Sequence, residues 1–279
     1  LSEIVAESVK PYNGTIKTDI NPQMTEAIPY VVQYNETTYE FLSRLAQRYG
    51  EYLFFENGKF YFGEKPTGKE IKLYPDTDLL GFRYGLEMAH TEFSHAQHDY
   101  LKYENSVEKG FDNSVKSLHG LADITFKKSH ETYNKQTLRN SHCATQEDAP
   151  LQQVKSSSMA EGLGQKANMM VCHLITNCAD IQIGDLLTLQ EYADDGQSRV
   201  INHEKMMVIA LRCSTTINGH FENEVTAIPA DATFAPYVNS VLYPMCESQR
   251  AVVVDNKDPQ HLGRVRVQFL WQELQDKKN

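Results

Sequence analysis

A β-hairpin is the most tightly constrained local structure in this sequence. Two aromatic runs, 52–56 and 59–63, are separated by Asn57 and Gly58 alone. Asn-Gly is the pair that a type I′ turn favours, because both central residues of that turn have positive φ angles. Since an isolated hairpin is marginally stable in water, its strands need an apolar face to pack against.

A helix expected over residues 38–49 offers the nearest apolar face. Thr37 and Glu40 have the spacing of a capping box, and a glycine follows where a left-handed residue commonly ends a helix. Phe41 and Leu45 lie on one apolar stripe of this helix. We predict that three hairpin phenylalanines are mostly buried against that stripe. They are Phe54, Phe60 and Phe62.

The first residues are expected to form a shorter helix, which makes the N-terminal part α+β. Leu1, Ile4, Val5 and Val9 have helical spacing. Pro11 is expected to end this helix, because proline disfavours the helical conformation of the residue before it.

From residue 70 onward the pattern changes to short strands bounded by turn residues. Apolar residues are sparse over 107–140, where we expect strands and loops. A short helix is expected within 148–164, with Gly162 and Gly164 in a turn that ends it. The strands expected outside these two stretches, between residues 71 and 228, have the regular spacing of a closed or nearly closed antiparallel barrel. The expected strands are 71–74, 80–88, 91–103, 169–176, 186–190, 200–212 and 222–228.

Prolines and weak alternation over 228–245 indicate a linker before a new unit. Two strand-like runs, 250–255 and 262–271, follow it. A barrel of the oligonucleotide/oligosaccharide-binding (OB) type needs about five strands, so this one is expected to be cut short. The expected fold is mainly β with an α+β N-terminal part, a hub-type antiparallel β-barrel and the start of an OB-type small barrel. The corresponding segments are 1–78, 79–238 and 239–279.

Residues 219–231, followed by the runs 250–255 and 262–271, resemble the VgrG family. These are the spike and hub proteins of type VI secretion, and they are related to the tail hubs of contractile phages. A second match, over 31–56, stands in family order at a family-like separation. The stretch 105–165 departs from the family pattern.

The resemblance implies a homotrimer in which tandem barrels create a pseudo-sixfold ring that matches the hexameric rings of the inner tube. It implies that the strand around 263–267 belongs to a small barrel preceding a needle-like β-helix. In the family, a first barrel would lie before residue 1 and the needle after residue 279. The implied partners are other copies of the chain, the tube protein and an effector or adaptor protein. A membrane is implied only as the target that is pierced.

Two other readings stay open. A baseplate hub of a phage, a prophage or an extracellular contractile injection particle uses the same fold as an assembly scaffold. A catalytic effector is the third and least expected reading. Neighbouring sequence would discriminate among them: a β-helix alone indicates a spike, an appended catalytic domain an effector-bearing spike, and a lysozyme-like insertion a phage hub.

Charge, apolar content and cysteine number limit the classes of partner and the cellular compartment that we expect for this chain. Lys and Arg number 27 against 37 Asp and Glu, and the net charge of −10 disfavours nucleic acid as the main partner. No apolar run approaches the roughly 18 residues of a membrane helix. Five cysteines, an odd number without regular short spacing, indicate a reduced cytosolic origin. We expect a cytoplasmic protein that the injection apparatus exports without a signal peptide.

The densest group of potential metal ligands is His90, His95, His98 and Asp99. Chelation by one element needs its ligands on one side. On a strand, His95 and His98 point to opposite faces. We therefore expect solvated histidines and no stoichiometric zinc or iron.

Nucleophilic catalysis lacks its usual sequence context. The chain contains no Gly-x-Ser-x-Gly elbow. Adjacent pairs such as Cys172 with His173, and His142 with Cys143, diverge on a strand. We therefore assign no catalytic, cofactor-binding or metal-binding residue, and we expect a structural protein that needs no cofactor and is not an enzyme.

Overall fold

The computed structural model describes residues 1–28, 30–99, 102–110, 120–141, 150–193, 200–238 and 245–272. The chain divides into two compact units, Leu1–Leu242 and Tyr243–Asn279, and each is described by itself. Within the described residues, no helix combines the length and the hydropathy needed to cross a membrane. The segment boundaries that we predicted at 78 and 238 stay predictions.

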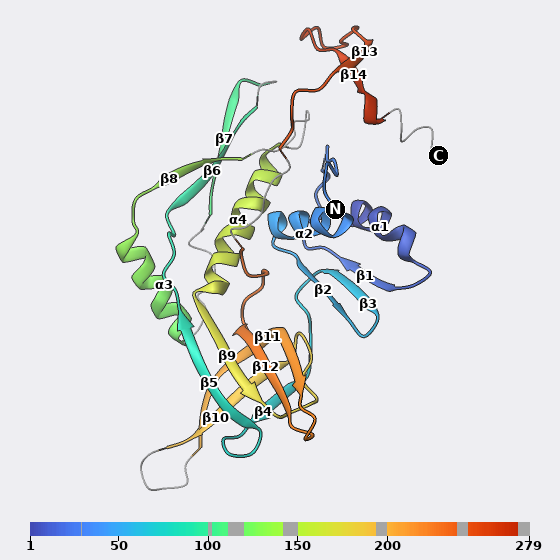
Figure 1. The fold of residues 1–279 in the computed structure, drawn as a ribbon. Coiled ribbons are helices and arrows are strands. Elements are labelled where there is room, and N and C mark those ends of the chain that lie inside the picture. The colour runs from blue at the N-terminus through green and yellow to red at the C-terminus, as the bar shows by residue number, and fades with distance from the viewer. Residues whose placement is uncertain are drawn as a thin grey trace. The chain divides into compact units, whose positions relative to one another are not determined.

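The N-terminal part is α+β, as expected. Helix α1 (Ser2–Val9) runs into a 3₁₀ turn, η1 (Lys10–Tyr12), and helix α2 (Thr38–Tyr49) has the predicted bounds. Strands β1 (Lys17–Asn21), β2 (Tyr52–Glu56) and β3 (Lys59–Gly63) form a sheet in the order β1-β3-β2 (Figure 1). Asn57 and Gly58 have φ angles of 51° and 76°, which confirms the positive-φ turn.

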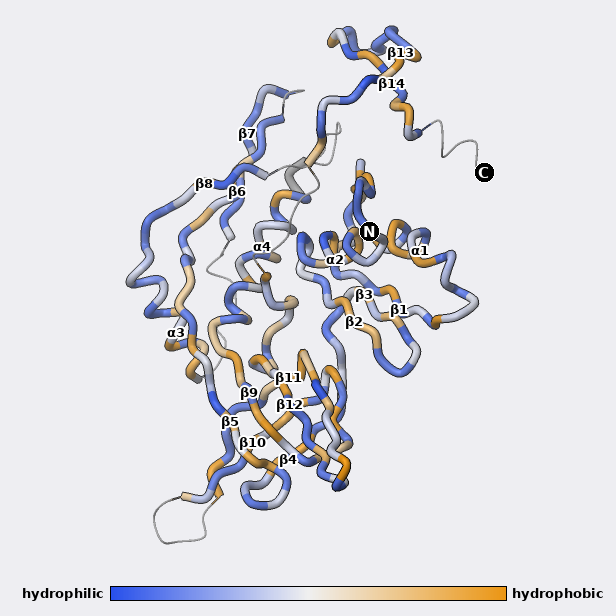
Figure 2. The backbone as a smooth tube through the Cα atoms, viewed as in Figure 1, coloured by the Kyte–Doolittle hydropathy of each residue, from blue (hydrophilic) through white to orange (hydrophobic). Residues whose placement is uncertain are grey.

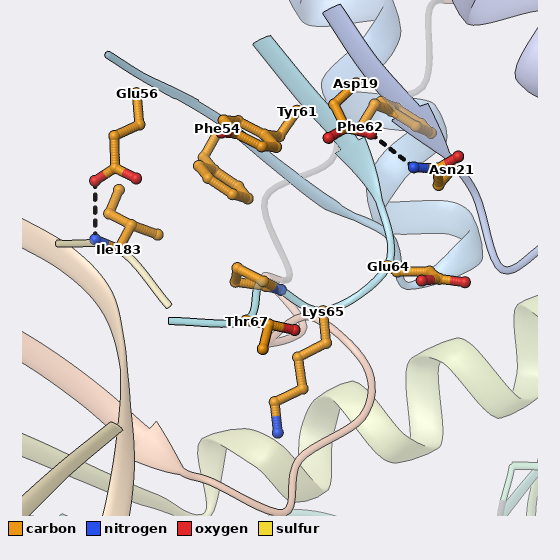
Figure 3. A pocket seen from close by; sticks show the side chains of 11 residues that line it. Asp19, Asn21, Phe54, Glu56, Tyr61, Phe62, Glu64, Lys65, Thr67 and Ile183 are labelled. Atoms are coloured by element: carbon orange, nitrogen blue, oxygen red, sulfur yellow. Dashed lines mark hydrogen bonds between the residues drawn. The ribbon is translucent and has the colours of Figure 1, made fainter. Parts of the chain in front are cut away.

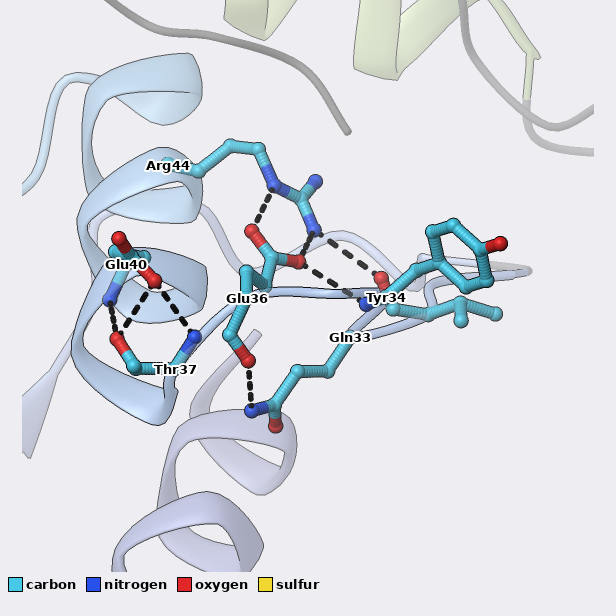
Figure 4. A network of polar contacts seen from close by, with 7 residues as sticks. Gln33, Tyr34, Glu36, Thr37, Glu40 and Arg44 are labelled. Carbon is cyan, nitrogen blue, oxygen red and sulfur yellow. Dashed lines mark hydrogen bonds and ion pairs between the residues drawn. The ribbon is translucent and has the colours of Figure 1, made fainter. Parts of the chain in front are cut away.

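Two sets of polar contacts hold the N-terminal end of helix α2 (Figure 4). The Thr37 hydroxyl accepts a hydrogen bond from Glu40 N, while the Glu40 carboxylate accepts from Thr37 N at 2.7 Å, which completes the capping box. One turn further on, the Arg44 guanidinium binds the Glu36 carboxylate through Nε at 3.0 Å and Nη2 at 2.5 Å. Arg44 also donates to Val32 O at 3.1 Å, and this holds the loop that leads into the helix.

The hairpin packs on α2 with one of its two faces, so the prediction for its phenylalanines is partly wrong. Phe60 and Phe62 are buried with Phe41 and Leu45, as expected. Phe54 pairs directly with Tyr61 across the hairpin and stacks on its ring, with the centroids 4.5 Å apart. Side chains alternate along a strand, so residue 54 lies on the face opposite to 60 and 62.

Among the described residues, six strands form the main sheet, in the order β4-β10-β11-β12-β9-β5. Their pairing is antiparallel except between β4 and β10, which are parallel. The sheet curls into a half-barrel (Figure 1), and the mainly β fold class expected from the closed or nearly closed barrel pattern is confirmed. Its strands are β4 (Glu70–Leu73), β5 (Leu79–Leu86), β9 (Met170–Thr176), β10 (Leu186–Tyr192), β11 (Val200–Thr215) and β12 (Phe221–Pro229).

The concave side of this sheet encloses the largest apolar core. Figure 2 shows apolar residues concentrated along β9 to β12. Side chains alternate between this core and the outer face, and part of the outer face is buried as well, because Met207 and Ile228 pack there with Tyr52 of the hairpin. The enclosed residues include Leu73, Met170, Leu174, Leu187, Met206, Val208 and Val225.

The stretch 107–140 contains a helix where we expected strands and loops, so that expectation is wrong in part. Helix α3 (Gly120–Thr132) lies between β7 (Glu104–Lys109) and β8 (Thr137–Asn140), which flank β6 (Phe93–Asp99) in a second sheet. The buried residues of α3 are Ala122, Thr125 and Ser129. Because they are small or polar, the helix has no apolar stripe that the sequence pattern would reveal.

Helix α4 (Pro150–Asn168) is longer than the short helix expected there. Gly162 and Gly164 lie in its interior, which corrects the prediction of a helix-ending turn. A Cβ at Gly162 would overlap the carbonyl oxygen of Gly110, and one at Gly164 would lie 2.8 Å from Ala235 O. Both glycines therefore serve close backbone contacts.

In the second unit, β13 (Ala251–Asp255) and β14 (Arg266–Phe269) form an antiparallel pair. Asp258 organises the loop between them: its carboxylate accepts from the backbone N–H groups of Gln260, Leu262 and Arg264 and from the Arg264 guanidinium, with Nη2 at 2.8 Å. These bonds lower the pKa of Asp258, with the Arg264 side chain as the largest cause. The start of an OB-type barrel stays a prediction.

Candidate functional site

The chain leaves the six-stranded sheet through residues 230–238, here called the strap. The strap lies against both α2 and α4 (Figure 1). Ala235 N donates to Gly50 O at 3.0 Å, and Tyr237 N donates to Gly164 O at 3.1 Å. The strap therefore ties the α+β part to the long helix just before the chain enters the second unit.

Side chains add further bonds to the strap. The Tyr52 hydroxyl donates to Phe234 O at 3.0 Å, and burial of Tyr52 raises its pKa. The Gln47 and Asn168 amides donate to Val238 O and Tyr237 O. Gly50, in the left-handed conformation with φ 70°, leaves room for the Phe234 ring, which a Cβ there would overlap. A single glycine thus ends α2 and leaves the space that the strap occupies.

Next to these contacts lies a buried carboxylate that the sequence analysis did not identify. Glu51 is 2% exposed and accepts from Gln23 N at 3.0 Å and Met24 N at 2.8 Å. Burial raises the pKa of Glu51, and these two bonds oppose the rise. The available sequence signal was an acidic residue between the helix glycine and the aromatic strand, in a segment that is otherwise buried.

Of the histidines considered as metal ligands, His95 is not solvated, which corrects that expectation. Its Nε2 lies 2.8 Å from Glu161 Oε2, and the Glu161 carboxylate also binds the Arg139 guanidinium. Burial lowers the pKa of His95 to about 4, and the nearby Arg139 and Arg48 guanidinium groups act in the same direction. His95 is therefore a neutral group that links β6 to α4.

The other candidates do not join His95. His98 lies on the opposite face of β6, as predicted, with Nδ1 3.0 Å from Asn105 Oδ1. His90 contacts Lys135 O at 2.6 Å, and the Cys172 thiol is buried in the main core, which raises its pKa to about 12. His142 and Cys143 lie outside the described residues. Across the described ranges, no three metal-ligating side chains converge on one point.

The outer face of the main sheet presents a shallow hollow of about 480 Å³ over β5, β9 and β12. Gly81 is part of its lining, and a Cβ there would meet no atom within 4 Å. Arg83, His173 and Glu224 supply polar groups to the lining. Within the described part of the chain, β9 is the only strand that pairs with β5, apart from a single bridge between Pro75 and Leu79, so this face ends at a largely open strand edge.

The comparisons with known proteins agree on one kind of protein. A family model described as the phage tail baseplate hub (GPD) matches residues 1–204. A search of curated proteins found no match.

Three solved structures share the fold at low identity. The tail protein from Neisseria meningitidis MC58 is 10% identical, covers 83% of this chain and 67% of its own, and has a TM-score of 0.53. The 43 kDa tail protein of prophage MuSo2 from Shewanella oneidensis is 13% identical, with coverages of 84% and 65% and a TM-score of 0.50.

The third is the Escherichia coli c3393 protein, a component of the type VI secretion system described as structurally similar to the T4 bacteriophage tail proteins gp27 and gp5. It is 12% identical, with coverages of 96% and 60% and a TM-score of 0.54. The present chain therefore spans about three fifths to two thirds of the length of these solved chains.

Proposed function

This chain belongs to the phage tail baseplate hub family, and on that premise we propose that it is a structural hub of a contractile injection machine, joining the inner tube to the spike. The observation that carries the proposal is the family match over residues 1–204. The likeness to solved tail proteins and to a type VI secretion component supports the same fold.

The proposed assembly is a homotrimer that meets a hexameric tube protein. A cyclic trimer repeats one heterologous contact until the ring closes. The open edge of β5 and the hollow beside it supply an unpaired surface for such a contact. The strap supports the role in another way, because it fixes where the chain leaves the sheet toward the second unit.

We propose type VI secretion as the machine, with the chain carrying effector or adaptor proteins. This assignment rests on the resemblance to VgrG of residues 219–231, 250–255 and 262–271. In this proposal the protein is not an enzyme, resides in the cytoplasm before firing, and is then exported by the apparatus itself.

The alternative is a baseplate hub of a prophage or of an extracellular contractile particle. The comparisons support this alternative equally, because the family model describes a phage baseplate hub and a prophage tail protein is among the similar structures. Both functions use the fold as a scaffold, so they differ in the partner tube.

Co-purification tests the proposal. The full-length protein is co-expressed with the tube protein encoded in the same gene cluster, and the complex is isolated through a tag on the hub. Recovery of the tube protein at two copies per hub chain, six to three, is the expected result. A hub that never retains the tube protein would refute the proposal, and the identity of the retained tube distinguishes secretion system from phage.

A further inference from the structure

On the hairpin face opposite α2 lies a pocket of about 280 Å³ (Figure 3). Phe54 and Tyr61 form one wall, and the connector from Glu64 to Thr67 and Ile183 lie across from it. The same sheet contributes Asp19, Asn21, Glu56 and Phe62 to the lining. Small-molecule sites usually measure about 300–1,000 Å³, so this volume suits a single side chain. The packing of the hairpin on α2 uses the other face. On the pocket face Phe54 is partly buried against the cluster of Met207 and Ile228, and the pocket lies beside that contact.

The aromatic pair already binds one cation within the fold. Lys59 Nζ lies 4.6 Å from the centroid of the Tyr61 ring, on a stack whose other member is Phe54. Asp19 holds this ammonium at 2.6 Å and raises its pKa. A cation above an aromatic face is attracted by the ring quadrupole, and here a carboxylate beside the ring fixes it. The Phe54 end of the stack has no such cation among the described residues.

Carboxylates stand at this end of the stack as well. Glu56 Oε1 accepts from Ile183 N at 3.0 Å, which positions the carboxylate at the pocket and leaves Oε2 available. Glu64 lines the pocket from the connector, and its side chain is exposed. The one cationic side chain in the lining, Lys65, directs its amino group to Ala230 O, away from the aromatic pair (Figure 3).

We propose that this pocket binds an arginine side chain of a partner protein in the assembly. The planar guanidinium stacks on Phe54 and donates to Glu56 Oε2, with Glu64 adding negative potential. Arginine fits better than lysine, because a guanidinium stacks on an aromatic plane and donates from its edge at the same time. The identity of the partner rests on the proposed hub function, whereas the chemistry of the pocket does not.

The proposal is tested with a small probe and the full chain. N-acetyl-arginine methylamide is titrated into protein carrying labelled Phe and Tyr rings, and the ring resonances are followed by NMR at constant ionic strength. A dissociation constant on the order of 10 mM is expected, because only one stacked cation and one charged hydrogen bond hold the probe. The shifts should be confined to Phe54 and Tyr61.

Two variants and two further probes make the result specific. Glu56→Gln keeps an acceptor for Ile183 N but removes the charge, and it should weaken binding at least about fivefold. Glu3→Gln, an exposed change on α1, alters the net charge equally and should leave binding unchanged. Shifts of equal size with the matching lysine or leucine probe, shifts that survive Glu56→Gln, or no shifts at all would overturn the proposal. None of these outcomes depends on tube binding, so failure here is distinct from failure of the hub function.

Discussion

Three glycines in this protein allow a neighbouring segment to come close, and this contact explains the residue type. Gly50, Gly162 and Gly164 each admit a neighbouring segment that a Cβ would obstruct. The sequence predicted Gly50, because a glycine after a capped helix has a local signature. It did not predict the other two, because their reason lies in contacts with residues 110 and 235, which no local pattern contains.

The substitution Gly162→Ala tests this reading. Alanine is the better helix former by about 1 kcal/mol, yet we expect the variant to lose about 1–3 kcal/mol of unfolding free energy, because its Cβ overlaps the Gly110 carbonyl oxygen. Urea denaturation measures the change. Gly81→Ala, whose Cβ meets open space, is the control and should change stability by less than about 1 kcal/mol. A stabilised Gly162→Ala variant would contradict the close contact.

His95 makes a pH-dependent contribution. Its pKa is about 4 in the folded chain against 6.5 for an ordinary histidine, so below pH 6.5 the unfolded chain binds the proton more readily. Stability should therefore be highest above pH 6.5 and fall as the pH drops toward 4, by up to about 1.4 kcal/mol per pH unit.

The comparison of two variants isolates this effect. In His95→Gln the loss of stability over that pH range should be shallower than in the parent chain, as measured by urea denaturation at several pH values. His98→Gln, on the solvent side of the same strand, should keep the parent slope. Equal slopes in all three proteins would show that His95 is not held neutral.

At the scale of elements, local signals predicted α2, the hairpin and most strands of the main sheet. Those elements have recognisable local patterns: a capping box, an Asn-Gly turn, or short apolar runs bounded by turn residues. Helix α3 carries none, because it buries Ala122, Thr125 and Ser129. The sequence does contain the signal for the face on which Phe54 lies, because the two-residue turn pairs it with Tyr61. The candidate pocket lies on that overlooked face.

The capping box of α2 gives an element-scale prediction. Thr37→Ala removes the hydroxyl that accepts from Glu40 N, and it should cost about 1 kcal/mol of stability. For a unit of this size the thermal midpoint should fall by about 2–4 °C. Differential scanning calorimetry provides the measurement, with Thr38→Ala, one residue inside the helix, as a near-neutral control. An unchanged midpoint in Thr37→Ala would show that the cap adds nothing.

At the scale of the whole molecule, the second unit exposes much of its apolar surface. Val252, Val253 and Val265 are each more than half exposed, and Val267 is 38% exposed. These side chains lie on or beside a two-stranded pair, which is marginal by itself. The sequence predicted the two strands but not what covers them, because covering residues from another segment or chain leave no local pattern.

We expect residues 1–279 by themselves to associate weakly. In the proposed assembly the needle intertwines three chains, whereas the hub alone presents a smaller and more polar contact. Light scattering over a range of protein concentrations measures the association. A trimer that persists unchanged at micromolar concentration would place the trimer's strength in the hub barrels instead.

We propose that this chain is a trimeric hub between tube and spike. Electron cryo-microscopy of the intact particle, with a tag inserted in the full-length protein, tests this claim most directly. Three copies are expected at the tip of the inner tube, with the curled sheet of each copy stacked on the last tube ring. Density for the tag along the tube, on the sheath or absent from the particle would contradict the claim.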